Sequence, residues 1–246
     1  MSLTVGVLAL QGDVSEHCRA LNACGIKSIA IKYEKELSLV DGLIIPGGES
    51  TTIAKLSFGR IEASTANVTT KDQNLVQKIS NSLTGSNSKI SVVVDKNEKL
   101  IPEENLINKI KGLGLGGMPI YGTCMGSIFL AKHIENNINQ FSMQLMDIKV
   151  SRNAFGPQKN SFETNLNIDF LGRQPFKAIF IRAPLIIDVG ENVEILANLP
   201  NYVETKQEFI TKAVMVREKN FLATAFHPEL TSDYRIHQYF IDMIKK

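Results

Sequence analysis

The sequence predicts an α/β protein with a central, mostly parallel sheet flanked by helices and with additional antiparallel strands. Apolar runs suited to strands, at residues 5–10, 26–33 and 43–45, are separated by turn residues and by a segment with helical spacing. Strands that alternate with helices indicate parallel pairing through crossover connections. In the second half, short β-rich runs follow one another with turn residues between them, which indicates antiparallel or mixed strands beside the parallel sheet.

The connections in the first half contain two sharp turns. Apolar residues recur at helical spacing over residues 14–24, after the first strand. The third strand ends in a Pro-Gly-Gly turn at residues 46–48, just before a polar helix start at residues 50–52. A further apolar run at residues 118–121 leads through a glycine-flanked turn into an apolar helix expected over residues 127–133. Both sharp turns fall at carboxyl ends of predicted strands, where open α/β sheets build their sites.

The second half is expected to contribute four short strands and a closing helix. The strand candidates are residues 178–181, 193–196, 213–216 and 221–224. The last segment, residues 233–245, carries apolar residues on one stripe and predicts an amphipathic helix.

A polar stretch interrupts this pattern in the middle of the chain. No aromatic residue occurs between residues 58 and 121, and residues 64–89 are dominated by Ser, Thr, Asn, Gln and Lys. We interpret residues 59–111 as a polar insertion, a surface excursion within one domain that spans all 246 residues. Within it, residues 89–95 are expected to form a strand and residues 102–111 a helix with proline in its first turn.

Composition and charge argue against several classes of function. With 43% hydrophobic residues, 21% charged residues and a net charge of +2, the chain should form a real core and carries no field that favours nucleic acid or an anionic membrane. Three cysteines without metal-ligand spacing argue against a disulfide scaffold and a structural zinc site. The first residues lack signal-peptide features, and no apolar run approaches the ~20 residues of a membrane span. We therefore expect a cytoplasmic protein.

The segment G-T-C-M-G at residues 122–126 is the first candidate for chemistry. It matches the pattern of a nucleophile between glycines at a strand-to-helix turn, with Cys124 in place of the more common serine. A helix N-terminus behind such a turn favours the thiolate, which is the reactive form of cysteine. The alternative interpretation is a buried cysteine in a glycine-rich turn, because a free cysteine usually behaves as a small hydrophobic residue.

A thiol nucleophile needs a base, and the chain has four histidines. His227 follows a predicted strand and precedes Glu229, a carboxylate that could orient its imidazole. His17 and His237 fall on predicted helices among polar neighbours, and His133 falls at the end of the helix after the Cys124 turn. We interpret these three as structural.

The P-G-G-E-S-T segment at residues 46–51 is a candidate anion or oxyanion site. Glycine permits close approach, and backbone N–H groups at a helix start are available as donors. The segment is not a P-loop, because the Gly-Lys-Ser/Thr ending is missing. On its own, a plain tight turn would be the default interpretation.

Six segments together carry a family resemblance: residues 5–12 (VGVLALQG), 46–52 (PGGESTT), 122–124 (GTC), 152–156 (RNAFG), 180–184 (FIRAP) and 226–230 (FHPEL). The chain resembles the class I glutamine amidotransferases, and within them the branch that serves as glutaminase subunit of pyridoxal 5′-phosphate synthase. The resemblance covers about residues 3–58 and 112–245. It implies the flavodoxin-like fold of that family.

The resemblance also implies roles for individual residues. Cys124 would be the nucleophile, His227 the general base and acid, and Glu229 the carboxylate that orients the histidine. Positions associated with glutamine binding are Gly48, Glu49, Ser50, Arg152, Ile181 and Arg182, and the oxyanion would be bound by backbone N–H groups of Gly48 and Met125. A cation such as Arg152 suits the α-carboxylate of glutamine, whereas Arg182 has a structural ion pair as its alternative role.

The implied reaction is hydrolysis of L-glutamine to L-glutamate and ammonia, with no metal or organic cofactor. The implied partner is a pyridoxal 5′-phosphate synthase subunit, in a hetero-oligomeric complex that uses the ammonia. Met125 departs from the small residue usual after the nucleophile, and the segment between the two glycine turns is longer than is typical. Two other interpretations therefore stay open: a cysteine hydrolase of another class, such as a peptidase or deglycase-like enzyme, and a non-catalytic assembly subunit.

Overall fold

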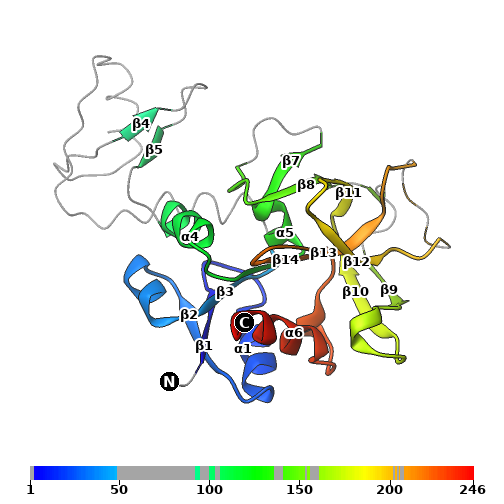
Figure 1. Cartoon of the computed structure of the whole chain (residues 1–246), viewed down its shortest axis with the longest axis horizontal. Helices are drawn as coiled ribbons and strands as arrows, with labels where there is room; N and C mark the ends of the chain where they lie inside the picture. The colour runs from blue at the N-terminus through cyan, green and yellow to red at the C-terminus, as the bar shows by residue number, and fades with distance from the viewer. Residues whose placement is uncertain are drawn as a thin grey trace.

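Figure 1 shows the chain in a computed structural model that describes residues 3–48, 92–94, 100–102, 106–135, 141–152, 154–155, 161–201, 203, 205 and 208–246. Its centre is a ten-stranded sheet with the order β2-β1-β3-β6-β14-β13-β11-β8-β7, to which β12 is added by pairing with β13. Two separate pairs, β9 with β10 and β4 with β5, complete the described strands. The predicted α/β class, with parallel strands and additional antiparallel ones, is confirmed.

One half of the sheet is parallel. Its strands, in spatial order, are β2 (Lys27–Ile31), β1 (Thr4–Leu8), β3 (Gly42–Ile45), β6 (Ile120–Thr123) and β14 (Phe221–Thr224). Every residue of the four inner strands is buried, as expected where helices cover both faces of a parallel sheet. The carboxyl ends of β1, β3 and β6 therefore meet at one edge.

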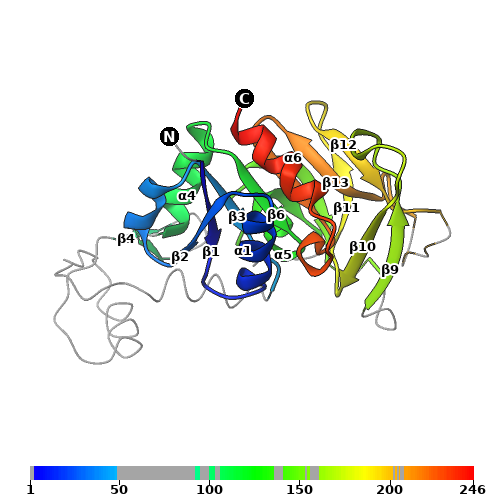
Figure 2. The same cartoon turned by 90° about the horizontal axis from the view of Figure 1, so that it is seen from below.

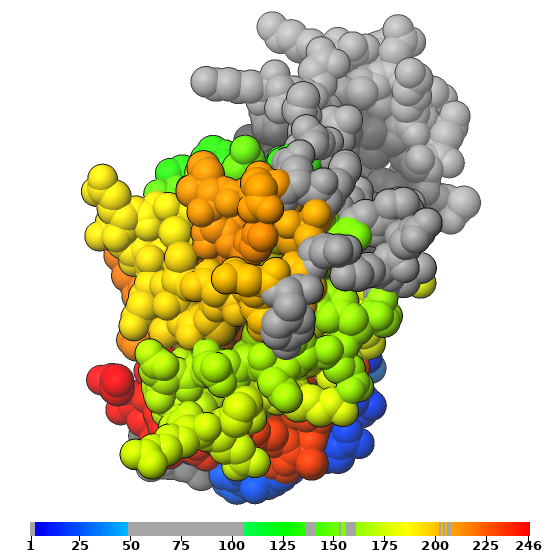
Figure 3. Space-filling view, turned by 90° about the vertical axis from the view of Figure 1, so that its right-hand side faces the viewer, coloured from blue at the N-terminus to red at the C-terminus, as the bar shows by residue number. Residues whose placement is uncertain are grey.

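The other half is mainly antiparallel and follows the order β14, β13 (Ala213–Glu218), β11 (Leu185–Val189), β8 (Met146–Ser151) and β7 (Ala131–Ile134). The pair of β7 with β8 is parallel. β12 (Glu194–Asn198) lies against β13, and β9 (Ser161–Leu166) pairs with β10 (Phe176–Ile181). Figure 3 shows this end of the molecule, where the yellow-green residues lie beside the yellow and orange residues that follow them in the sequence.

Helices cover both faces of the sheet (Figures 1 and 2). α1 (Val14–Ala23) and α6 (Arg235–Ile244) lie on one face, and α4 (Leu106–Leu115) and α5 (Met125–Leu130) lie on the other. Alternate strand residues supply the two cores, since Ile44 packs in the cluster that includes the α6 residues and Ile45 in the cluster that includes the α4 residues. Within the described residues, no helix combines the length and apolar character needed to span a bilayer.

Three short 3-10 helices complete the described elements, at Glu34–Leu39, Asp169–Leu171 and Pro228–Leu230. The apolar helix predicted over 127–133 is partly wrong. α5 ends at Leu130, and the chain continues directly as β7 because its next residues pair with β8. Tertiary pairing therefore overrides the local apolar pattern there.

Part of the middle segment is described. β4 (Val92–Val94) pairs with β5 (Leu100–Pro102), so the strand predicted near residues 89–95 is present. The helix predicted from residue 102 begins later, at Leu106, because Pro102 belongs to a strand of a two-stranded pair, where proline is tolerated. The polar residues 64–89 and the predicted helix start at 50–52 lie outside the described residues, and the single domain with an insertion stays a prediction.

The turn between β6 and α5 requires glycine on both sides of Cys124. A Cβ atom at Gly126 would overlap the carbonyl oxygen of Ile45 on β3, and one at Gly122 would collide with the backbone of Gly126. Cys124 itself has a φ of 47°, a left-handed conformation that is costly for a residue with a side chain. The close strand-helix packing is therefore set by the glycines.

We expect Gly126→Ala to lower the free energy of unfolding by roughly 2 kcal/mol, because the added methyl group must displace backbone rather than a flexible side chain. Gly112→Ala is the matched control. Gly112 lies in α4 with open space around its Cα, so alanine there should stabilise the protein by about 0.5–1 kcal/mol. Urea unfolding of both variants measures the difference, and equal stabilities would contradict the close approach at Gly126.

Two buried histidines join the helices on one face of the sheet. Nδ1 of His17 on α1 lies 3.0 Å from Nε2 of His237 on α6, and both side chains have no exposed surface. Burial holds the pKa of His17 well below its ordinary value, and repulsion from His237 and His227 acts in the same direction. Burial lowers the pKa of His237 from 6.5 to about 4. Both imidazoles are therefore neutral in the folded protein near pH 7.

A folded-state pKa below the unfolded one makes stability pH-dependent, because the unfolded chain binds protons more readily. His237 should stabilise the fold fully above about pH 6.5, and its contribution should be lost as the pH falls toward about 4. The wild type should lose stability when the pH falls from 7.5 to 4.5. In His237→Gln we expect this loss to be smaller by on the order of 2 kcal/mol. The measurement is thermal unfolding at both pH values. His133→Gln, on the exposed part of β7, should behave like the wild type, and an unchanged acid loss in His237→Gln would contradict the assignment.

Candidate active site

The turn after β6 fixes Cys124 in one position. Its N–H donates to the carbonyl oxygen of Thr224 on β14 at 2.8 Å. Its own carbonyl oxygen accepts from the hydroxyl of Ser127 at 2.6 Å and from the N–H of the same serine at 3.1 Å. The cysteine is only 6% exposed and has φ and ψ of 47° and −108°. A strained residue held by three hydrogen bonds at the end of a strand is typical of a nucleophile position.

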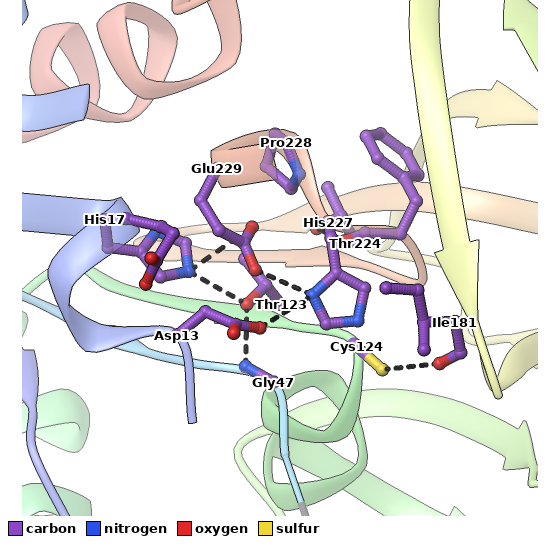
Figure 4. Close-up of polar contacts among 12 residues, drawn as sticks. Asp13, His17, Gly47, Thr123, Cys124, Ile181, Thr224, His227, Pro228 and Glu229 are labelled. Atoms are coloured by element: carbon purple, nitrogen blue, oxygen red, sulfur yellow. Dashed lines mark hydrogen bonds and ion pairs between the residues drawn. The ribbon is translucent and has the colours of Figure 1, made fainter. Parts of the chain in front are cut away.

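His227 and Glu229 face this cysteine from the chain segment after β14 (Figure 4). The N–H of His227 donates to the carbonyl oxygen of Ile179 at 2.9 Å, which ties the segment to β10. Pro228 starts a 3-10 turn that brings Glu229 back toward the ring. Nδ1 of His227 lies 2.7 Å from Oε1 of Glu229, and the other side of the ring faces Cys124. The carboxylate is fully buried.

The charges around His227 favour its protonated form. Burial acts against the charged ring, but hydrogen bonds with Asp13, Cys124 and Glu229 outweigh it and raise the pKa of His227 to about 12. Burial raises the pKa of Glu229, while its contacts with His227 act in the opposite direction. An imidazolium beside a cysteine stabilises the thiolate, so the arrangement suits nucleophilic chemistry at sulfur.

Asp13 is a second carboxylate at the ring, and the sequence interpretation missed it. Its Oδ2 lies 3.4 Å from Nδ1 of His227, and the side chain is 39% exposed. A metal ion could be held here by three side chains, those of Asp13, His227 and Glu229. Each offers one ligand atom, and these three atoms lie within 4.8 Å of one another. The same Nδ1 atom is engaged by both carboxylates, however, so a metal there would displace the proton that joins His227 to Glu229.

The predicted glycine turn lies against both reactive side chains. A Cβ atom at Gly47 would overlap the ring of His227 and would lie 3.3 Å from Cβ of Cys124. The N–H of Gly47 donates to Oγ1 of Thr123 at 3.0 Å. Gly48 has a φ of 142°, and the Gln11 side chain lies beside it. Glu49 and Ser50, the next predicted site residues, lie outside the described residues.

Ile181, at the end of β10, closes the other side of the cysteine. Its carbonyl oxygen accepts a hydrogen bond from the Cys124 thiol at 3.8 Å. Phe180 stacks on Phe162 with ring centroids 4.6 Å apart and also contacts Phe226, the residue before His227, at 5.6 Å. The aromatic contacts therefore connect the β9–β10 hairpin to the His227 segment.

The two predicted arginines lie at the same end of the sheet. Arg152 follows β8 and is half-buried, and the neighbouring Ser151 pairs with Leu185 at the start of β11. Arg182 precedes β11, is exposed and has a φ of 43°. Arg182 forms no ion pair with another described residue.

Met125 is only 3% exposed and belongs to the apolar cluster that α4 and α5 form against the sheet. The bulk of its side chain therefore lies in the core, and its backbone follows the cysteine as in the expected pattern.

All three remaining histidines differ from expectation in their setting. His17 and His237 were expected among polar neighbours, but both are buried, because the helices α1 and α6 turn these positions toward the sheet. Nε2 of His17 lies 3.4 Å from Oε2 of Glu229. His133 is exposed, on a strand instead of a helix end. No sequence pattern distinguishes a buried histidine such as His17 or His237 from a surface residue, because contacts with residues distant in sequence bury it.

Comparison with known proteins agrees with this architecture. The profile of the SNO glutamine amidotransferase family matches residues 7–62 and 59–246, in two stretches that meet where the polar insertion was predicted to begin. A protein named pyridoxal 5′-phosphate synthase subunit PdxT from Thermotoga sp. (strain RQ2) is 39% identical over 243 residues, covering 99% of this chain and all of the relative. One with the same name from Pelotomaculum thermopropionicum is 41% identical over 240 residues, covering 98% and 94%.

Among solved structures, one described as a glutamine amidotransferase superposes with a TM-score of 0.71 at 33% identity and covers 98% of this chain and 99% of its own. The family resemblance inferred from the six sequence segments is thereby confirmed. This chain belongs to the SNO glutamine amidotransferase family.

Proposed function

We propose that this protein is a glutaminase that hydrolyses L-glutamine to L-glutamate and ammonia and delivers the ammonia to a pyridoxal 5′-phosphate synthase subunit. The observation that carries the proposal is the placement of Cys124, on a strained turn, against the ring of His227, which is itself bonded to the buried carboxylate of Glu229. The names of the relatives supply the synthase as partner.

In the first half-reaction, the Cys124 thiolate attacks the side-chain amide carbon of glutamine. The carbonyl oxygen becomes an oxyanion, for which the backbone N–H groups of Gly48 and Met125 are the proposed donors. His227 gives its proton to the amide nitrogen, the C–N bond breaks, and ammonia leaves. A glutamyl thioester on Cys124 and a neutral imidazole remain.

In the second half-reaction, neutral His227 takes a proton from water. The resulting hydroxide attacks the thioester, the C–S bond breaks, and Cys124 is again a thiolate beside the protonated His227. The new γ-carboxyl group gives its remaining proton to water, and glutamate leaves. Glu229 keeps the ring in the orientation that serves both steps and stabilises its charged form. Neither half-reaction requires a cofactor.

Recognition of glutamine is assigned to residues around this pair. The end of β10 and the loop after β8 bring Ile181, Arg182 and Arg152 to one end of the sheet, where a guanidinium group can bind the α-carboxylate. Gly48, Glu49 and Ser50 are proposed to bind the substrate from the glycine turn. The burial of Met125 in the core favours an active enzyme over an assembly subunit, because its side chain does not occupy the site.

We expect Cys124→Ala to abolish ammonia release from glutamine in the complex with the synthase subunit, because no other thiol faces His227. Cys18→Ala and Cys24→Ala are the matched controls and should keep wild-type activity, since Cys18 packs against the apolar core from α1 and the Cys24 thiol faces the carbonyl oxygen of Tyr234. The assay is coupled detection of glutamate and ammonia. Full activity of Cys124→Ala would show that Cys124 is not the nucleophile. Turnover of esters or peptides, with none of glutamine, by the wild type would favour another class of cysteine hydrolase.

The residues of the His227–Glu229 pair should differ in the size of their effects. His227→Asn should lower kcat by at least about 10³-fold, because no other group can move the proton, and Glu229→Gln should lower it less. In both variants KM for glutamine should stay within about threefold, since neither side chain is assigned to substrate binding. His133→Asn controls for loss of a histidine. An equal loss in His133→Asn, or none in His227→Asn, would place the base elsewhere.

A further inference from the structure

The proposed mechanism uses one of the four histidines, but two others are buried behind it. We propose that His17, backed by His237, is a positioning residue of this active site: its Nε2–H holds the second oxygen of Glu229 and so fixes the carboxylate that orients His227. The inference rests on the proposed glutaminase function, because it assigns a role within the same site. Figure 4 shows His17 on the side of Glu229 that is opposite to His227.

The contacts leave Glu229 with one strong partner and one weaker one. Oε1 lies 2.7 Å from Nδ1 of His227. Oε2 is fully buried and has no well-formed hydrogen bond within the described part of the chain, but Nε2 of His17 lies 3.4 Å from it. A buried carboxylate oxygen with no donor is costly. His17 supplies the nitrogen that faces it.

The proton positions on the two histidines follow from their contacts. If Nε2 of His17 carries the proton, its N–H is shared between Oγ1 of Thr123 at 3.2 Å and Oε2 of Glu229 at 3.4 Å. Nδ1 is then free to accept from Nε2–H of His237 at 3.0 Å. Nδ1 of His237 is then a bare acceptor, which agrees with its lack of a partner among the described residues.

The opposite tautomers fit poorly. They would direct a lone pair of His17 at the carboxylate, and they would leave a buried N–H of His237 without an acceptor, which is the rarer defect in proteins. A carboxylate that accepts from charged His227 cannot itself supply the missing proton. In the favoured tautomers, His227 and His17 direct an N–H toward Glu229, and His237 directs its N–H toward His17.

The same nitrogen of His17 also reaches the glycine turn. It lies 3.2 Å from Oγ1 of Thr123, the residue before the nucleophile, and that oxygen accepts from the N–H of Gly47. A single imidazole thus contacts the residue that orients the base and the residue that anchors the turn beside Cys124. Its loss should affect turnover through orientation, without changing how strongly glutamine binds.

The test compares two amides at position 17. Glutamine places its NH₂ group near the position of Nε2 and can still donate to Glu229, whereas asparagine reaches only the position of Nδ1. We expect His17→Asn to lower kcat of the complex with the synthase by about tenfold or more, with KM unchanged, and His17→Gln to recover most of that loss. His133→Asn and His133→Gln, on exposed β7, should leave both constants at wild-type values.

The outcomes separate positioning from packing. Equal kcat values for His17→Asn and His17→Gln, or a loss confined to KM, would overturn the proposal. Thermal unfolding of each variant shows whether it is folded at the assay temperature. If His17→Asn does not fold, His17→Gln alone decides, because a low kcat in a folded glutamine variant would show that the donor to Glu229 is not what matters.

A measurement on the unaltered protein is independent of any variant's folding. Selective ¹⁵N labelling of the four histidines distinguishes the tautomers of a neutral imidazole by the shifts of its two nitrogens. We expect the Nε2–H tautomer for both His17 and His237, and an Nδ1–H tautomer of His17 would overturn the proposal. If the wild-type complex released no ammonia, the proposed function would fail, while the tautomer of His17 would still decide the histidine network.

Discussion

The burial of the Glu229 carboxylate is the constraint around which the rest of the site is arranged. An ionised group with no access to water costs several kcal/mol unless charge and hydrogen bonds compensate it. Compensation comes from His227 on one oxygen and, in our proposal, from His17 on the other. The high pKa of His227 and the low pKa of His17 are two results of one environment, because the same low-polarity interior favours one positive charge next to the carboxylate and disfavours a second.

The parallel half of the sheet explains why these residues meet. β1, β3 and β6 end at one edge, so the loops that follow them bring Asp13, Gly47 and Cys124 together, and β14 adds His227 from the end of the chain. The separate antiparallel β9–β10 hairpin adds Ile181. Parallel strands thus supply the reactive side chains, and an antiparallel hairpin supplies the opposite side of the site. The close packing in between depends on glycines that have no side chain to fill the space.

Local sequence was enough to predict the strand ends and the residues placed on them. The strand before Cys124, the glycine turn after β3 and the segment that carries His227 all have strong local signals, because buried strands and sharp turns restrict residue choice. Asp13, His17 and His237 could not be predicted in this way. Each owes its place to a contact between residues distant in sequence, and the helical pattern around His17 does not distinguish a buried polar residue from an exposed one. β7 was missed for a similar reason, since only its pairing with β8 makes it a strand.

The hydrogen bond from Cys124 to Thr224 has a consequence for protein synthesis. The cysteine is translated long before β14, so a nascent chain contains the thiol but nothing to hold its strained turn or to supply its histidine. In such a nascent chain the cysteine is therefore neither held in its strained turn nor placed beside His227. In the proposed mechanism, glutamine is consumed and ammonia released only after β14 has inserted between β6 and β13 and has brought His227 to the cysteine.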